Sequence, residues 1–128
     1  MSYNASNIGK VLYALLNSTV ATHPLIAPQN TQTPYLIYSI LSIDPDDTKQ
    51  TTSMADTVTV LLMVYEDTIG DAATRANSIR TILDGYAGTS GGVTVNSITY
   101  VNESDGGYDE ELMKYIKIQE YNIRINNT

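Results

Sequence analysis

The segment Gly88-Thr89-Ser90-Gly91-Gly92 comes nearest to a catalytic motif, because its letters match the Gly-x-Ser-x-Gly turn that presents a nucleophilic serine. That turn needs a strand before it and a helix after it, whereas here a helical pattern precedes and a strand pattern follows. The only histidine in the sequence, His23, also precedes Ser90, so the hydrolase order of serine, acid and histidine cannot be completed. The same glycines lack the Lys-Ser/Thr ending of a phosphate-binding loop. We interpret the segment as a turn.

Two groups of carboxylates could hold a divalent cation. In the first group, Asp44, Asp46 and Asp47 resemble the start of a calcium-binding loop. Lys49 stands where that loop needs glycine, and Ala55 stands where it needs a bidentate glutamate. Adventitious binding of a divalent ion to this group stays open, but a dedicated calcium site is excluded.

The second group of carboxylates consists of Asp105, Asp109, Glu110 and Glu111. We interpret it as the solvated tip of a hairpin. Paired carboxylates that act on sugars need a cleft and usually aromatic platforms, and the sequence has no Trp and no Phe. The sequence therefore predicts no catalytic residue, no cofactor-binding residue and no metal ligand, and we do not expect an enzyme.

Length and composition restrict the class of protein. A chain of 128 residues is long enough for one domain, residues 1–128, which buries about two-thirds of its unfolded surface. The absence of cysteine excludes disulfides, thiolate metal sites and a cysteine nucleophile. No apolar run approaches the roughly 18 residues of a membrane span, and the N-terminus lacks a signal-peptide pattern. We expect a soluble protein that is not secreted by that route and has no membrane partner.

The formal charge of −7 arises from fourteen carboxylates against seven Lys and Arg residues. Such a surface repels nucleic acid. Two interpretations stay open: the charge keeps the protein in solution, or it forms a surface to which a neighbouring polyanion does not adhere.

Two segments show helical spacing. The first has apolar residues at Ile8, Val11, Leu12, Leu15 and Leu16, with Asn4 or Ser6 available as the N-cap. The second is expected from about Thr68 to Tyr86, with Gly85 or Gly88 ending it. Its apolar face is expected to comprise Ile69, Ala73, Ala76, Ile79, Ile82 and Leu83.

Four segments are predicted to be strands, at residues 35–43, 55–66, 93–101 and 112–125. The second is apolar on both faces over residues 61–64, so we expect it at the centre of the sheet with a helix over one face. A turn at Gly106-Gly107 is expected to join the last two strands. Residues 19–34 hold three prolines and are interpreted as an ordered loop or a ragged edge strand. The predicted fold class is α+β: a single domain with a mainly antiparallel four-stranded sheet and two helices packed on one face, in the order α-β-β-α-β-β.

The last strand carries apolar residues on both of its faces. Ile116 and Ile118 have one parity, whereas Tyr121, Ile123 and Ile125 have the other. A bulge near residues 119–120 would turn both groups inward; without it, half of the strand faces a partner. The ten tyrosines of the chain are informative in another way, since tyrosine is enriched in protein interfaces, although we expect many of them to be ordinary sheet and core residues. We take Tyr108, Tyr115 and Tyr121 as the candidate subunit or partner interface.

Several segments together resemble one known family. They are Pro28-Gln29, the run Thr33-Pro34-Tyr35-Leu36-Ile37-Tyr38, the strand Val58–Glu66 with the Ala/Arg/Ile helix after it, residues 103–108, and Tyr121-Asn122-Ile123-Arg124-Ile125. As a set covering nearly the whole chain, they resemble the tail-completion and tail-terminator proteins of tailed bacteriophages, which are small head-tail joining proteins of the neck.

That resemblance implies a structural virion protein that forms a ring, typically six-fold, through which the genome passes. Its partners would be copies of itself and proteins of the tail tube or of the connector and portal side, with DNA passing unbound. It would be found in the virion tail or neck, and in the host cytoplasm during assembly, and it would need no cofactor. Asp44, Asp46 and Asp47 are then the candidate acidic loop lining the channel.

Two other functions stay open. A monomeric module could bind a peptide or protein by adding an extended segment to an open sheet edge. A small enzyme is the third reading, and it has the least support. The mass of the purified protein separates a ring from a monomer.

Overall fold

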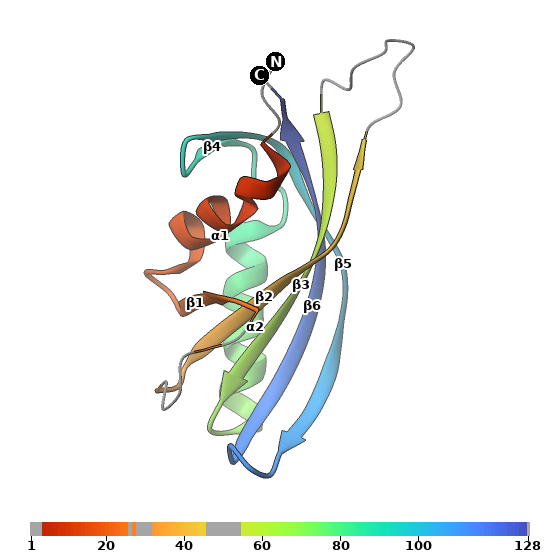
Figure 1. Cartoon of the computed structure of the whole chain (residues 1–128). Coiled ribbons are helices and arrows are strands. Elements are labelled where there is room, and N and C mark those ends of the chain that lie inside the picture. The colour runs from red at the N-terminus through yellow and green to blue at the C-terminus, as the bar shows by residue number, and fades with distance from the viewer. Residues whose placement is uncertain (1–3, 26, 28–31, 46–54, 128) are drawn as a thin grey trace.

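In the computed structural model, which describes residues 4–25, 27, 32–45 and 55–127, two α-helices lie on one face of a curled six-stranded sheet (Figure 1). The expected four-stranded, mainly antiparallel sheet is therefore wrong, although the α+β class stands. The observed order is β1 (Ala21–Pro24), β2 (Tyr35–Pro45), β3 (Ala55–Glu66), β6 (Lys114–Asn126), β5 (Val93–Asp109) and β4 (Gly88–Ser90). β1 pairs with β2 in parallel, so the sheet is mixed.

The two strands beyond the expected four are short and lie at the sheet edges. β1 ends at Pro24, inside the proline-containing segment for which an edge strand was one of the two expectations. β4 lies within the glycine-containing segment interpreted as a turn, and the turn itself is confined to Gly91-Gly92. Short edge strands with proline or glycine carry a weak sequence signal because few of their residues face the core.

The first helix, α1 (Ile8–Leu16), forms where its apolar spacing predicts, after a short 3-10 turn at residues 5–7. Its buried residues are Ile8, Val11, Leu12 and Leu16. Neither Asn4 nor Ser6, the two expected candidates, is the N-cap of α1; Asn7 holds that position, without a side-chain capping bond. Instead, the Asn4 side-chain amide donates to the Asn126 carbonyl at 3.1 Å, and the Asn4 backbone N–H donates to Asn127 Oδ1 at 3.1 Å. Asn4 thus ties the start of the described chain to its end.

The second helix, α2 (Ile69–Leu83), is capped by Thr68, whose hydroxyl accepts from the Asp71 N–H at 3.0 Å. Its buried residues are Ala72, Ala76, Ile79 and Leu83. Ile69 was expected on the buried face but is 65% exposed. The helix presents Ala72 rather than Ala73 to the sheet, and this moves Ile69 to the rim of the core.

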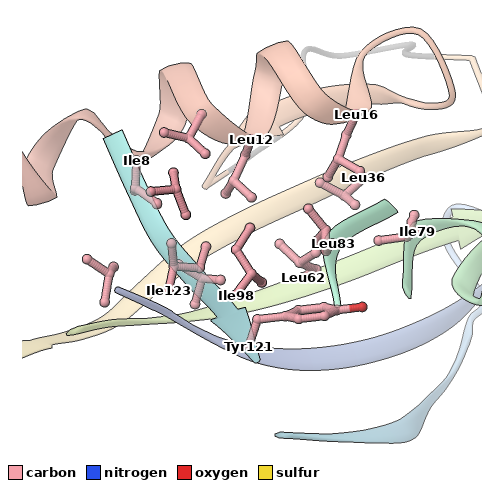
Figure 2. Packing of buried hydrophobic residues seen from close by; sticks show 14 of the residues in the cluster. Ile8, Leu12, Leu16, Leu36, Leu62, Ile79, Leu83, Ile98, Tyr121 and Ile123 are labelled. Atoms are coloured by element: carbon pink, nitrogen blue, oxygen red, sulfur yellow. The ribbon is translucent and has the colours of Figure 1, made fainter. Parts of the chain in front are cut away.

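The core lies between the helices and one face of the sheet. As predicted, β3 is central, between β2 and β6, and its residues Val58, Val60, Leu62 and Val64 are fully buried. Figure 2 shows the α1 residues Ile8, Leu12 and Leu16 on one side of the core, with sheet residues opposite them, including Leu62, Ile98, Tyr121 and Ile123.

Strand β5 is longer than expected, and it bends. It continues through Gly106-Gly107, which do not form the predicted turn, and the chain turns back at residues 110–113. Against β6, strand β5 holds one extra residue at each of three points: Asn96, Val101 and Gly106. Such bulges strengthen local twist and bend the strand. They account for the curl of this side of the sheet in Figure 1.

Strand β6 has no bulge at residues 119–120, since its pairing with β3 is continuous from Tyr115 to Asn126. The two apolar groups of β6 therefore face opposite ways. Tyr121, Ile123 and Ile125 are buried beneath the helices, whereas Ile116 and Ile118 lie on the helix-free face. The expected bulge is therefore absent, and the alternative, that this half of the strand faces a partner, stays a prediction.

Candidate functional site

The helix-free face of the sheet has an apolar half, formed by the first residues of β2 and the last residues of β3. Tyr35, Ile37 and Tyr65 are buried there, and Met63 and Ile116 are among the residues that pack against them. The rings of Tyr35 and Tyr65 stack with centroids 4.7 Å apart and an interplanar angle of 12°. Burial is the main cause that raises the pKa of each phenol above its ordinary value. This half is a second small core.

The other half of the helix-free face is polar. The pairing places Ser42, Thr59, Asn122 and Thr99 in one row across four strands. Within that row, the Thr59 hydroxyl donates to Asn122 Oδ1 at 2.9 Å. Asp44, Thr57, Arg124 and Ser97 form the next row. In this half of the helix-free face, short hydroxyl and amide side chains thus lie beside the charged residues Asp44 and Arg124.

Among the described residues, each of the two edges of the sheet has a long stretch without a neighbouring strand. β1 pairs with β2 only as far as Tyr38, so residues 39–45 of β2 have no neighbouring strand on their outer side among the described residues. Three exposed apolar residues lie on this stretch: Ile40, Leu41 and Ile43, with exposed fractions of 39, 53 and 41%. An open apolar edge of this kind is a site for pairing with another strand.

On the opposite side, β4 pairs with β5 only over Val93–Val95. The turn after α2 covers the next residues, because the Gly85 N–H donates to the Ile98 carbonyl at 2.9 Å and the Ile98 N–H donates to the Tyr86 carbonyl at 3.0 Å. Asp84 Oδ1 accepts from the Tyr100 N–H at 3.2 Å. From Val101 to Asp109, the outer side of β5 has no strand beside it within the described part of the chain.

The three tyrosines that we expected at one interface do not all lie in one place in the structure. Tyr108 and Tyr115 lie side by side, with ring centroids 4.8 Å apart. With Ile69 and Ala72 of α2, they line a hollow of about 310 Å³ on the helix side of β5. Sequence reasoning missed the part played by Ile69, because its spacing assigned it to the core.

Tyr121 is fully buried in the core, so its side chain is not part of the surface of the folded chain. Its hydroxyl donates to Gln119 Oε1 at 3.0 Å. Gln119 is also fully buried, and its amide donates to the Ala76 carbonyl at 3.0 Å and to Glu103 Oε1 at 2.8 Å. Burial raises the pKa of Tyr121 well above its ordinary value. Tyr115 has the same parity as Tyr121, so only their places along β6 separate them: Tyr121 lies beneath the helices, whereas Tyr115 lies at the start of the strand, opposite Tyr108.

Of the proposed channel-lining carboxylates, the structure places Asp44, near the end of β2. It is exposed, lies on the helix-free face, and its Oδ2 accepts from the Ser42 hydroxyl at 3.0 Å. Asp46 and Asp47 lie outside the described residues, so their place beside Asp44 stays a prediction.

The second acidic group is partly neutralised. Lys117 Nζ lies 2.7 Å from Asp105 Oδ1 and 3.6 Å from Glu103 Oε2, and the hydrogen bond to Asp105 is the main cause that raises the pKa of Lys117. Over the described residues, no group of three or more His, Cys, Asp or Glu side chains could hold a metal ion.

The serine of the rejected catalytic motif and the histidine of the chain also lie far apart in the structure. Ser90 lies in β4 and His23 lies in β1, which are the two outermost strands of the sheet. Ser90 is buried, and its hydroxyl donates to the Val11 carbonyl at 3.2 Å. The serine therefore fixes β4 to α1.

The fold is shared with a virion component. No family model matches the chain, and no curated protein matches it. Among solved structures, it is similar to a chain of the virion of a native gene transfer agent particle, with a TM-score of 0.62 and 15% sequence identity over 98% of this chain and 91% of that one. At this identity the likeness concerns the fold. Within the described residues, no helix is long and apolar enough to cross a membrane.

Proposed function

We propose that this chain is a structural subunit of a phage-like virion. The observation that carries the proposal is the likeness, over nearly the whole length of both chains, to a chain of a gene transfer agent virion. A protein of this kind acts through its surfaces. This agrees with a described chain whose most distinctive features are two open sheet edges and a polar helix-free face.

We further propose that the subunit assembles with copies of itself into a ring at the neck, where it completes the tail or joins it to the head. Closed rings arise when two different surfaces of one subunit pair head to tail. Proteins of the tail tube or of the connector and portal side would contact the two rims, and the protein would be found in the virion and, during assembly, in the host cytoplasm.

The genome passes through the ring without specific binding. With a formal charge of −7, the subunit repels a polyanion, and Asp44 on the polar face, with Asp46 and Asp47, would line the passage. No catalysis and no cofactor are required for this role.

Light scattering of the purified protein over a range of concentrations, with negative-stain images of any large species, tests the proposal. We expect a closed ring with a central hole. A monomer at every concentration that binds an extended peptide would instead support the alternative, a module that adds a strand at the open edge of β2.

A further inference from the structure

We propose that the ring closes through one continuous β-sheet, in which residues 39–45 of β2 in one subunit pair with residues 101–109 of β5 in the next. This inference rests on the proposed ring and specifies its subunit interface. The partner is therefore a second copy of this chain.

The strand directions are compatible with such pairing. β2 is antiparallel to β3, β3 is antiparallel to β6, and β6 is antiparallel to β5, so β2 and β5 run in opposite directions within one subunit. If a neighbouring subunit has the same orientation, its β5 meets β2 as an antiparallel strand. The head-to-tail repeat thus continues the antiparallel pairing of the four central strands.

The two open stretches lie at different levels along the strands. The centre of the β2 stretch, Ser42, lies in the row of Asn122, and the centre of the β5 stretch, Asp105, pairs with Lys117. These levels are five residues apart on β6, or roughly 17 Å, while the four strands β2, β3, β6 and β5 span roughly 19 Å. In a level ring, this offset tilts the strands by about 40° from the axis, which is within the range of closed barrels.

The hand of the tilt indicates which face lines the hole. α2 connects the parallel strands β3 and β5, and such crossovers are right-handed. When the sheet is viewed from the helix side with β2 pointing up, β2 is therefore the rightmost of the four central strands. The next subunit, whose β5 pairs with the open stretch of β2, is displaced to the right and upward relative to the first. The strands therefore lean to the right, as strands of closed barrels do when seen from outside, because sheets twist right-handedly. The helices are outside, and the helix-free face with Asp44 lines the hole.

The side chains at the two edges are also complementary. Ile40 and Ile43 pair with Val60 and Val58 and so point to the helix side of the sheet, where they are partly exposed. The hollow lined by Ile69 and Tyr108 lies on the same side of β5. Pairing of the two edges brings this apolar patch to that hollow and removes both from water.

Disulfide trapping tests the interface, since the chain has no cysteine of its own. Ser42 and Ser104 both lie on the helix-free face, in the open stretches of β2 and β5, so Ser42→Cys with Ser104→Cys reports contact between subunits. Ser42→Cys with Asn102→Cys covers a register shifted by two residues. Ser42→Cys with Ser97→Cys is the matched control, because Ser97 has the same face but lies where residues 84–86 adjoin β5.

After mild oxidation of the assembled full-length protein, non-reducing gels should show a ladder from dimer up to the closed ring for Ser104→Cys or Asn102→Cys. The crosslinked fraction should be about tenfold higher than for Ser97→Cys, because a disulfide needs closely spaced Cα atoms. Rings that form but give no more crosslinking than the control would overturn the edge pairing and leave the ring intact. A protein that never assembles would overturn the proposed ring, and the interface with it.

Discussion

The buried hydrogen bonds around Gln119 are the most consequential polar contacts at the residue scale. Tyr121→Phe removes the hydroxyl that donates to Gln119 Oε1 and leaves that oxygen buried without this donor. We expect the free energy of unfolding to fall by about 1–3 kcal/mol. Urea unfolding measures the loss. Tyr13→Phe on the exposed side of α1 serves as control, and an equal loss in both variants would contradict the role of the buried bond.

The buried tyrosines also make stability depend on alkaline pH. Burial raises the pKa of Tyr35, Tyr65 and Tyr121 in the folded chain, so the unfolded chain releases these protons first as the pH rises. Below the ordinary pKa of 10.0 these tyrosines are protonated in both states, and stability does not depend on pH through them. Above it, the unfolded chain is deprotonated first, so the free energy of unfolding falls as the pH rises. Urea midpoints measured from pH 7 to about 11 should fall above pH 10, and they should fall less steeply in Tyr121→Phe. Parallel curves for the two proteins would rule out a contribution from Tyr121.

The ion pair of Glu66 and Arg75 joins β3 to α2. Arg75 Nε lies 2.8 Å from Glu66 Oε2, and Arg75 Nη1 donates to the Thr19 carbonyl at 2.9 Å. Arg75→Met leaves a nearly buried carboxylate without its cation, and we expect a loss of about 2–4 kcal/mol in urea unfolding. The matched variant Arg80→Met, in an exposed pair, should lose less than about 1 kcal/mol. Equal losses would mean that burial of the pair is unimportant.

At the scale of elements, the bulge at Gly106 tests the curvature of β5. A Cβ atom at this position would meet Ile116 Cγ2 at 2.7 Å and Ile118 Cδ1 at 3.1 Å. Gly106→Ala should therefore lower the thermal midpoint, with a cost of about 1–3 kcal/mol. Gly70→Ala is the control, since nothing lies within 4 Å of its added Cβ and alanine favours the helix. A neutral Gly106→Ala would show that β5 does not need its present bend.

The open edge of β2 gives the second prediction at this scale. Ile43→Lys places a charge in the proposed interface, and we expect assembly to need at least roughly tenfold more protein, since charges on edges oppose pairing. Light scattering against concentration measures the shift. Tyr13→Lys adds the same charge on exposed α1 and should assemble normally. If both variants assemble as the parent does, this edge is not the contact.

The same scale shows how far the sequence could predict the fold. Periodicity located both helices and the central strand β3, because those segments bury a regular stripe of apolar residues. The edge strand β4 was missed, and β1 was only one of two alternatives for its segment, since three or four residues beside proline or glycine carry too little pattern. The Gly106-Gly107 pair has the composition of a turn and yet forms a bulge, because the residues after it continue the pairing with β6.

The candidate site was predictable only in part, for the same physical reason. Side-chain types indicated tyrosines at an interface. Tyr115 and Tyr121 have the same parity on β6, however, and only their different places along the strand separate them, because the helices cover Tyr121. The open edges could not be predicted at all, because an edge is defined by which strands are adjacent, and adjacency depends on contacts far apart in sequence.

At the scale of the whole molecule, we expect the acidic charge to affect the binding and passage of DNA more than it affects assembly of the ring. Changing Asp44, Asp46 and Asp47 to Lys shifts the formal charge from −7 to −1, because each change adds two units. We expect the ring to persist, DNA to bind it at low salt, and genome release to slow, since positive groups attract phosphate. Fluorescence anisotropy with labelled duplex DNA measures binding, and Thr74→Lys with Asn77→Lys is a control at exposed positions of α2, on the other side of the sheet. Unchanged binding and release in the triple variant would remove the channel assignment.

The contact of Asn4 with Asn126 and Asn127 has a practical consequence for imaging. Both described ends of the chain lie together at one pole of the subunit (Figure 1). In a ring of subunits with one orientation, all of these poles point toward the same rim. A bulky tag fused to either end would decorate that rim alone, so labelled particles would reveal in a micrograph which way up the ring sits.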